Sequence, residues 1–137
     1  MSLLARPQQI VLPILREALP DVNVNTWIAD VDYREFPLII VRRFGGVRDQ
    51  SHPTLFSKPI IELSAYSDVG LPECEQLYED ALEALYLAVR NQTMTEHGYL
   101  RSVRETMGAS QFSSLFQDSW RIQGLLMLGI RPPRIPT

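Results

Sequence analysis

The segment Asp49-Gln50-Ser51-His52-Pro53 holds an acid, a hydroxyl and an imidazole, the side chains that a hydrolytic triad combines. Such triads are assembled from positions that a rigid scaffold brings together, and adjacent residues of one loop rarely reach that geometry. Asp, Ser and Pro are also typical turn-forming residues. The sequence therefore favours a turn-rich polar loop. An enzymatic or small-ligand-binding α+β domain, with this loop lining a pocket, is the alternative.

Cys74 lies on the apolar stripe of a predicted helix, where it fits as a small core residue; a nucleophile would need exposure and a histidine partner. Two histidines, His52 and His97, and one cysteine lack the spacing of a zinc site. Gly45-Gly46 lacks the further glycines and the following helix of a phosphate-binding loop. We therefore predict no catalytic residue, no metal and no cofactor. A single cysteine also excludes an internal disulfide and is typical of the reducing cytoplasm.

The composition predicts one domain over residues 1–137, because a chain of 137 residues with 45% hydrophobic residues can form one core. The net charge of −3 argues against a dedicated nucleic-acid-binding protein, since such proteins usually carry a basic patch. No stretch approaches the roughly 20 apolar residues of a membrane span, so we expect no membrane partner.

Two strands separated by a long polar segment organise the chain. The first, Phe36–Phe44, is rich in β-branched residues, and Gly45-Gly46 is expected to end it. The second, Lys58–Tyr66, alternates between a dry face and a mixed face. The intervening Gly45–Ser57 is longer than the usual hairpin loop of about 2–5 residues. Loops of that length usually carry a function or stay disordered until a partner holds them.

Two helices are predicted from apolar residues at i, i+3 and i+4 spacing. Pro7–Leu19 contains Pro13, so this helix either kinks there or begins near it. Pro72–Asn91 has the longest apolar stripe and an acidic first turn. It is long enough to cover the dry face of the central strands.

The other predicted strands complete the fold class. They are Asn25–Asp30, Leu100–Met107 and Trp120–Ile130, with a charged turn at Asp32–Glu35 and a loop at Gly108–Asp118. In the last strand, Leu125 and Met127 add apolar groups opposite the main apolar face, so the fold or a neighbouring subunit must cover both faces. The order predicts an α+β fold: a mainly antiparallel sheet with a long hairpin, one long helix packed on it and an N-terminal helix.

The hairpin and the last strand supply the candidates for contacts with other chains. Arg42 and Arg43 point to opposite faces, so one can pair with Glu62 while the other, with Arg48, can bind a carboxylate of another chain. Apolar residues of the long loop have no sheet position to fill. The predicted subunit or partner interface comprises Arg42, Arg43, Phe44, Val47, Arg48, Asp49, Leu55, Phe56, Leu125 and Met127.

The runs FPLIIVRRFGG, HPTLFSKP, IIELSAY and LYEDALEAL, in this order, resemble the tail terminator proteins of long-tailed bacteriophages. The resemblance covers about Phe36 to Arg90, and elsewhere only the order of elements agrees. It implies a structural virion protein, assembled in the host cytoplasm, that caps the head-proximal end of the tail tube as a ring, usually a hexamer. The implied partners are further copies of the chain, the tail tube protein and a neck or head-completion protein. DNA would pass through the bore without specific binding. Another neck or head–tail joining component of the same virion is the alternative within this class.

Overall fold

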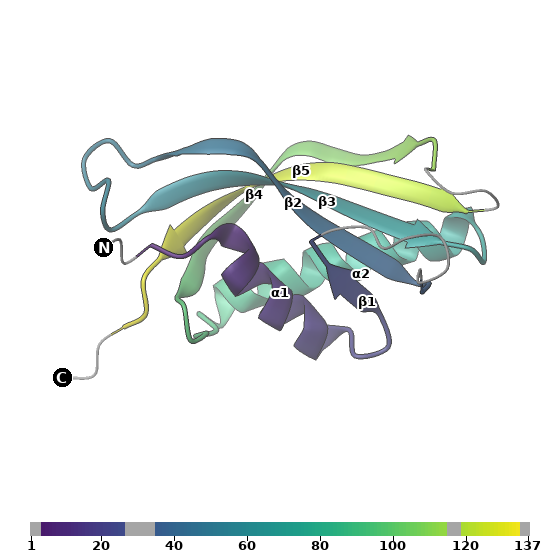
Figure 1. The fold of residues 1–137 in the computed structure, drawn as a ribbon, viewed down its shortest axis with the longest axis horizontal. Helices are drawn as coiled ribbons and strands as arrows, with labels where there is room; N and C mark the ends of the chain where they lie inside the picture. Colours follow the sequence, from purple (N-terminus) through teal and green to yellow (C-terminus); the bar gives the residue numbers. More distant parts are fainter. Residues whose placement is uncertain (1–3, 27–34, 115–118, 135–137) are drawn as a thin grey trace.

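The computed structural model describes residues 4–26, 35–114 and 119–134, which form two helices and five strands (Figure 1). In chain order these are α1 Pro7–Ala18, β1 Asn23–Asn25, β2 Leu38–Arg48, β3 Ser57–Ser67, α2 Leu71–Arg90, β4 Tyr99–Phe112 and β5 Trp120–Arg131. The predicted α+β class is confirmed. Neither α1 nor α2 combines the length and the apolar character that a membrane-crossing helix requires.

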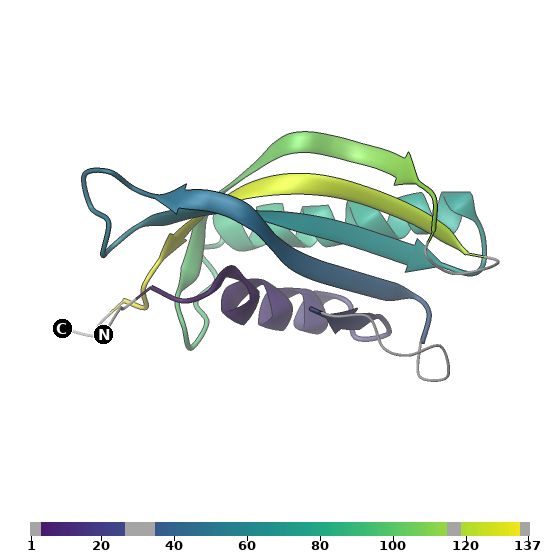
Figure 2. The same cartoon turned by 45° about the horizontal axis from the view of Figure 1, so that its top comes forward.

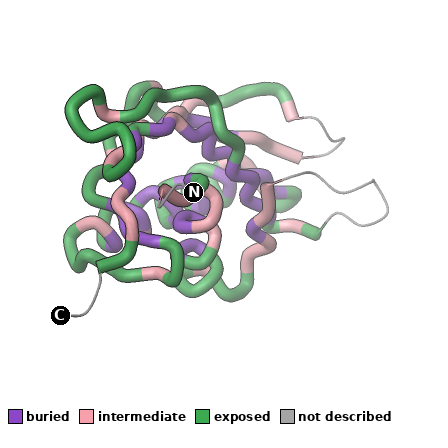
Figure 3. The backbone as a smooth tube through the Cα atoms, turned by 60° about the vertical axis from the view of Figure 1, so that its left-hand side comes forward, coloured by how far each residue is buried: buried purple, intermediate pink, exposed green. Residues whose placement is uncertain are grey.

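The five strands form one sheet in the order β1-β2-β3-β5-β4. All neighbours pair antiparallel except β1 and β2, which are parallel. Both α1 and α2 lie on the same face of this sheet, and the opposite face is open in the described part of the chain (Figures 1 and 2). The buried residues gather between the helices and the sheet, while exposed segments form the periphery (Figure 3).

The helices follow the periodicity of the sequence. Helix α1 begins at Pro7, where a proline is tolerated because the first amides have no partner within the helix. It includes Pro13, so the alternative of a start near Pro13 is wrong. Helix α2 has the predicted bounds to within one residue. Its apolar stripe is buried from Cys74 to Leu85, whereas Tyr86 in the next position is exposed.

The prediction that Gly45-Gly46 ends the first strand is wrong. β2 runs through both glycines to Arg48, with a shift of register between Arg43 and Gly46 that places a β-bulge in the pair with β3. Gly45 and Gly46 have φ of +88° and +93°, and a Cβ on Gly46 would lie 2.5 Å from the Cα of Pro59. The glycines therefore allow the strand to twist and continue, and the connecting loop shrinks to residues 49–56.

The predicted loop at Gly108–Asp118 is also wrong in its first part, because β4 continues to Phe112. This strand lies at the edge of the sheet and is mostly exposed, so its sequence lacks the alternation that identifies a half-buried strand. Its pairing with β5 shifts register around Met107, which an edge strand tolerates. Two residues of the predicted strand Asn25–Asp30 are described: Asn25 belongs to β1, and Thr26 follows it. The rest, like most of the turn at Asp32–Glu35, lies outside the described residues.

Candidate partner-binding surfaces

The part of the β2–β3 hairpin beyond the bulge, Gly46–Pro59, projects past the ends of both helices and is called the arm here (Figures 1 and 2). Val47 pairs with Lys58 and Arg48 with Ser57, so Val47 does have a position in the sheet, contrary to the prediction. Phe44 at the base of the arm, Val47 and Leu55 are 58%, 68% and 44% exposed. Three large apolar side chains thus face solvent on one projecting hairpin.

The loop of the arm is closed by its own hydrogen bonds. The amide of Asp49 donates to the carbonyl of Phe56 at 3.2 Å, and the amide of Phe56 donates to the carbonyl of His52 at 3.0 Å. The Asp49 carboxylate accepts the amides of Ser51 and His52 at 3.1 and 2.9 Å, and it lies 3.6 Å from the Lys58 ammonium. The amide of His52, followed by Lys58, keeps the pKa of Asp49 below its ordinary value. Asp49 is therefore engaged within its own subunit.

A basic groove of about 600 Å³ separates this loop from the neighbouring ends of β4 and β5. Phe56 lines this groove, with the guanidinium of Arg131 3.9 Å and that of Arg101 5.3 Å from the ring centroid. The ring of His52 meets Phe56 edge-on at 5.8 Å. The Asp49–His52 loop does line a groove, as the enzymatic alternative requires. The Asp49 carboxylate accepts the loop amides, and Nδ1 of His52 lies 3.6 Å from that carboxylate, beyond hydrogen-bond distance.

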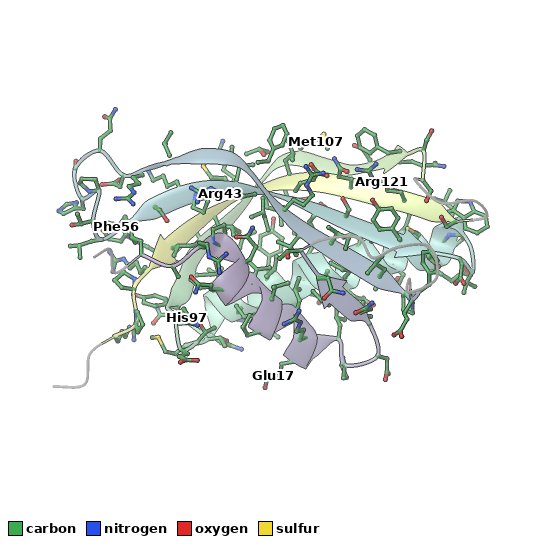
Figure 4. All side chains as sticks on the ribbon, in the orientation of Figure 1. Glu17, Arg43, Phe56, His97, Met107 and Arg121 are labelled. Atoms are coloured by element: carbon green, nitrogen blue, oxygen red, sulfur yellow. The ribbon has the colours of Figure 1, made fainter. Side chains whose placement is uncertain are left out.

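The sheet face opposite the helices holds three more of the predicted residues, Arg42, Leu125 and Met127. One row across four strands runs Arg42, Glu62, Leu125 and Met107, and Met127 of the next row pairs with Ile60 and Arg104. Leu125, Met127 and Met107 are half-buried on this face, with Met107 and Arg121 on the side away from the helices (Figure 4). The prediction of two apolar faces for β5 agrees with this arrangement.

The expected ion pair between Glu62 and Arg42 or Arg43 is wrong. Arg42 is the cross-strand neighbour of Glu62, but the guanidinium of Arg121 takes the carboxylate at 3.4 Å. Both partners of this pair are largely buried, and Arg121 also donates to Gln123 and lies 5.7 Å from the ring centroid of Tyr66. Arg42 and Arg43 remain exposed on opposite faces.

Cys74 is completely buried, and its thiol donates to the carbonyl of Ala65 at 3.2 Å. Burial raises the pKa of this thiol, which disfavours the reactive thiolate. His97 lies on the turn before β4, on the helix side of the sheet (Figure 4). Within residues 4–26, 35–114 and 119–134, no three His, Cys, Asp or Glu side chains gather as metal ligands would.

The arm and the open sheet face carry exposed or half-buried apolar side chains. A family model described as phage tail termination protein matches residues 3–137. The chain belongs to the phage tail termination protein family.

It is 58% identical over 139 residues to the Gene 22 protein of Mycobacterium phage D29, covering 100% of both chains. It is 57% identical over 136 residues to the Gene 22 protein of Mycobacterium phage L5, covering 98% of each. A solved chain titled "Virion of native gene transfer agent (GTA) particle" aligns with 91% of this chain and 94% of its own length, at 12% identity and a TM-score of 0.47.

As a phage tail termination protein, the chain is a structural component of the virion tail and not an enzyme. This confirms the resemblance seen in the hairpin and the long helix. Sequence reasoning missed three apolar residues on the open face, namely Ile60, Met107 and Phe112. Ile60 pairs with the predicted Met127, Met107 pairs with the predicted Leu125, and Phe112 is the last residue of β4. The sequence signal for Phe112 is the apolar character of the segment around it, because a loop fully exposed to solvent is usually polar.

Proposed function

We propose that six copies of this tail termination protein close into a ring on the head-proximal end of the phage tail tube. The whole chain acts in it as one domain. The ring ends the tube protein's polymer and offers the opposite surface to a neck or head-completion protein. DNA passes through the bore without specific binding, in keeping with a net charge of −3, because phosphate contacts are what hold DNA.

The arm is the observation that carries this proposal. Phe44, Val47 and Leu55 are exposed on a hairpin that stands clear of the subunit's own helices. Apolar side chains on a projecting hairpin stay exposed to water in a monomer, whereas a contact with another subunit buries them. Arg43 and Arg48 beside these groups provide charge-assisted hydrogen bonds across such a contact.

The open face of β5 and β4 is the second proposed contact. Leu125 and Met127, with Met107 on the neighbouring strand, form a half-buried apolar strip that neither α1 nor α2 covers. Glu62 and Arg42 lie in the same cross-strand row as Leu125, so this row extends from β5 to β2, the strand that leads into the arm. We assign this face to the tube or neck protein, since its polar and apolar mixture suits a contact made after the subunit has folded.

The test is the assembly state of the purified chain, alone and mixed with its tail tube protein. Light scattering and native mass spectrometry give the mass, and negative-stain images show whether a closed ring sits on the tube. We expect a closed ring when the tail tube protein is present, whether or not the chain forms one alone. A chain that stays monomeric both alone and with the tube protein would defeat the proposal.

A further inference from the structure

An acidic hollow of about 310 Å³ lies where β3 leads into α2. Val69, which is 72% exposed, and Leu77 give it an apolar surface. The side chains of Asp68, Glu73 and Asp80 also line it, and the described lining residues include no basic one. An occupant that matches this hollow presents an apolar group with positive charges beside it.

The arm tip, residues Arg48–Lys58, has that character. Leu55 is exposed at the turn, and Arg48 and Lys58 stand at the two ends of the tip. Asp49 is the sole acid in this segment, and its carboxylate is already engaged by the loop amides and by Lys58. The basic groove next to the tip adds Arg101 and Arg131. The tip therefore offers an apolar group within a positive surface.

The two surfaces lie at opposite ends of the long axis of the molecule. The arm tip forms one end, and the junction of β3 and α2 forms the other, in both views of the ribbon (Figures 1 and 2). A tip therefore does not reach the hollow of its own subunit. Complementary surfaces at opposite ends are the requirement for a head-to-tail contact, which closes into a ring when the rotation between subunits permits.

We propose that the arm tip of one copy docks into the acidic hollow of the next copy. The proposal rests on the ring proposed above and names the two surfaces that join its subunits. Leu55 packs against Val69 and Leu77, and the cations of the tip face the three carboxylates of the hollow. Because both surfaces carry charge, the contact weakens as the salt concentration rises.

Two charge-reversed variants of the full chain test this contact, with the tail tube protein present throughout. Arg48→Glu reverses the tip, and the double variant Asp68→Arg/Asp80→Arg reverses the hollow. Glu17→Arg is the matched control, because Glu17 is exposed on α1 away from both ends (Figure 4). Each reversed variant alone brings like charges together, so its apparent Kd for ring formation should rise about tenfold or more. The control should assemble like the wild type.

Mixing the two reversed variants in equal amounts provides the decisive measurement. A reversed tip then meets a reversed hollow, and a normal tip meets a normal hollow, so an alternating ring is expected, visible by native mass spectrometry. Both variants should melt like the wild type in circular dichroism. Normal rings from either variant alone, or folded variants whose mixture does not assemble, would overturn this contact and leave the ring intact. A wild-type chain that never forms a ring would instead overturn the ring itself.

Discussion

Replacing Tyr78 by phenylalanine should make this protein more stable. The Tyr78 side chain is completely buried under the sheet, and within the described part of the chain its hydroxyl has no hydrogen-bond partner. It lies against Gly124, a position where any side chain would collide with it. A buried hydroxyl without a partner costs about 1–3 kcal/mol. Removing the oxygen recovers that cost, less the contacts that the oxygen makes with its neighbours.

The expected net gain for Tyr78→Phe near neutral pH is about 1 kcal/mol in the free energy of unfolding, or roughly 3–5 °C in Tm for a chain of this size. Alkaline pH should enlarge it. Burial, with the charges of Glu105 and Glu79, raises the pKa of Tyr78 from 10.0 to about 12. A group whose pKa is raised in the folded state stabilises fully below its unfolded pKa and loses that contribution as pH rises toward its folded pKa. The wild type should therefore lose about 1.4 kcal/mol by about pH 11, and the variant should not.

Urea unfolding followed by circular dichroism, at one protein concentration and at several pH values, measures both effects. Tyr86→Phe is the matched control, because the Tyr86 hydroxyl is exposed and donates to Glu105 at 3.0 Å. Its unfolding free energy should change by about 0.5 kcal/mol or less. A loss of stability of about 1 kcal/mol or more in Tyr78→Phe would show that the hydroxyl makes a hydrogen bond, and the reasoning would be refuted.

Two further predictions concern the bulge and the core. Gly46→Ala should lower the unfolding free energy by about 1–3 kcal/mol. Gly46 has a φ of +93°, which alanine rarely adopts, and the added Cβ would collide with backbone atoms of β3. Gly108→Ala, at a position with open space, should stay within about 0.5 kcal/mol of the wild type, and equal losses would argue against the bulge. Cys74 should resist a thiol reagent at mildly alkaline pH until the chain is unfolded, because burial hides its sulfur and raises its pKa. Equal rates in folded and unfolded protein would contradict its place in the core.

Residues near one another in the chain carried the predictions that proved right. The stripe on α2 follows the period of a helix, and the alternation along β3 places Ile61, Leu63 and Ala65 toward the helices. The same alternation placed Leu125 and Met127 on the opposite face of β5. These features depend only on backbone geometry and on the apolar character of each residue, so the sequence alone determined them. The family was recognisable for the same reason, since its pattern lies in the hairpin and the long helix.

Only the tertiary structure decided which segments and charges meet. Gly45-Gly46 continues a strand because β3 lies beside it and supplies the backbone partners on either side of a bulge; an isolated chain would turn there. Glu62 pairs with Arg121, which comes from a strand distant in sequence, and the ring of Phe56 meets arginines of both β4 and β5. The position of the arm tip at the far end from the acidic hollow likewise follows from how the sheet is assembled. Such contacts depend on strand order and register, and no local pattern of residue types encodes these.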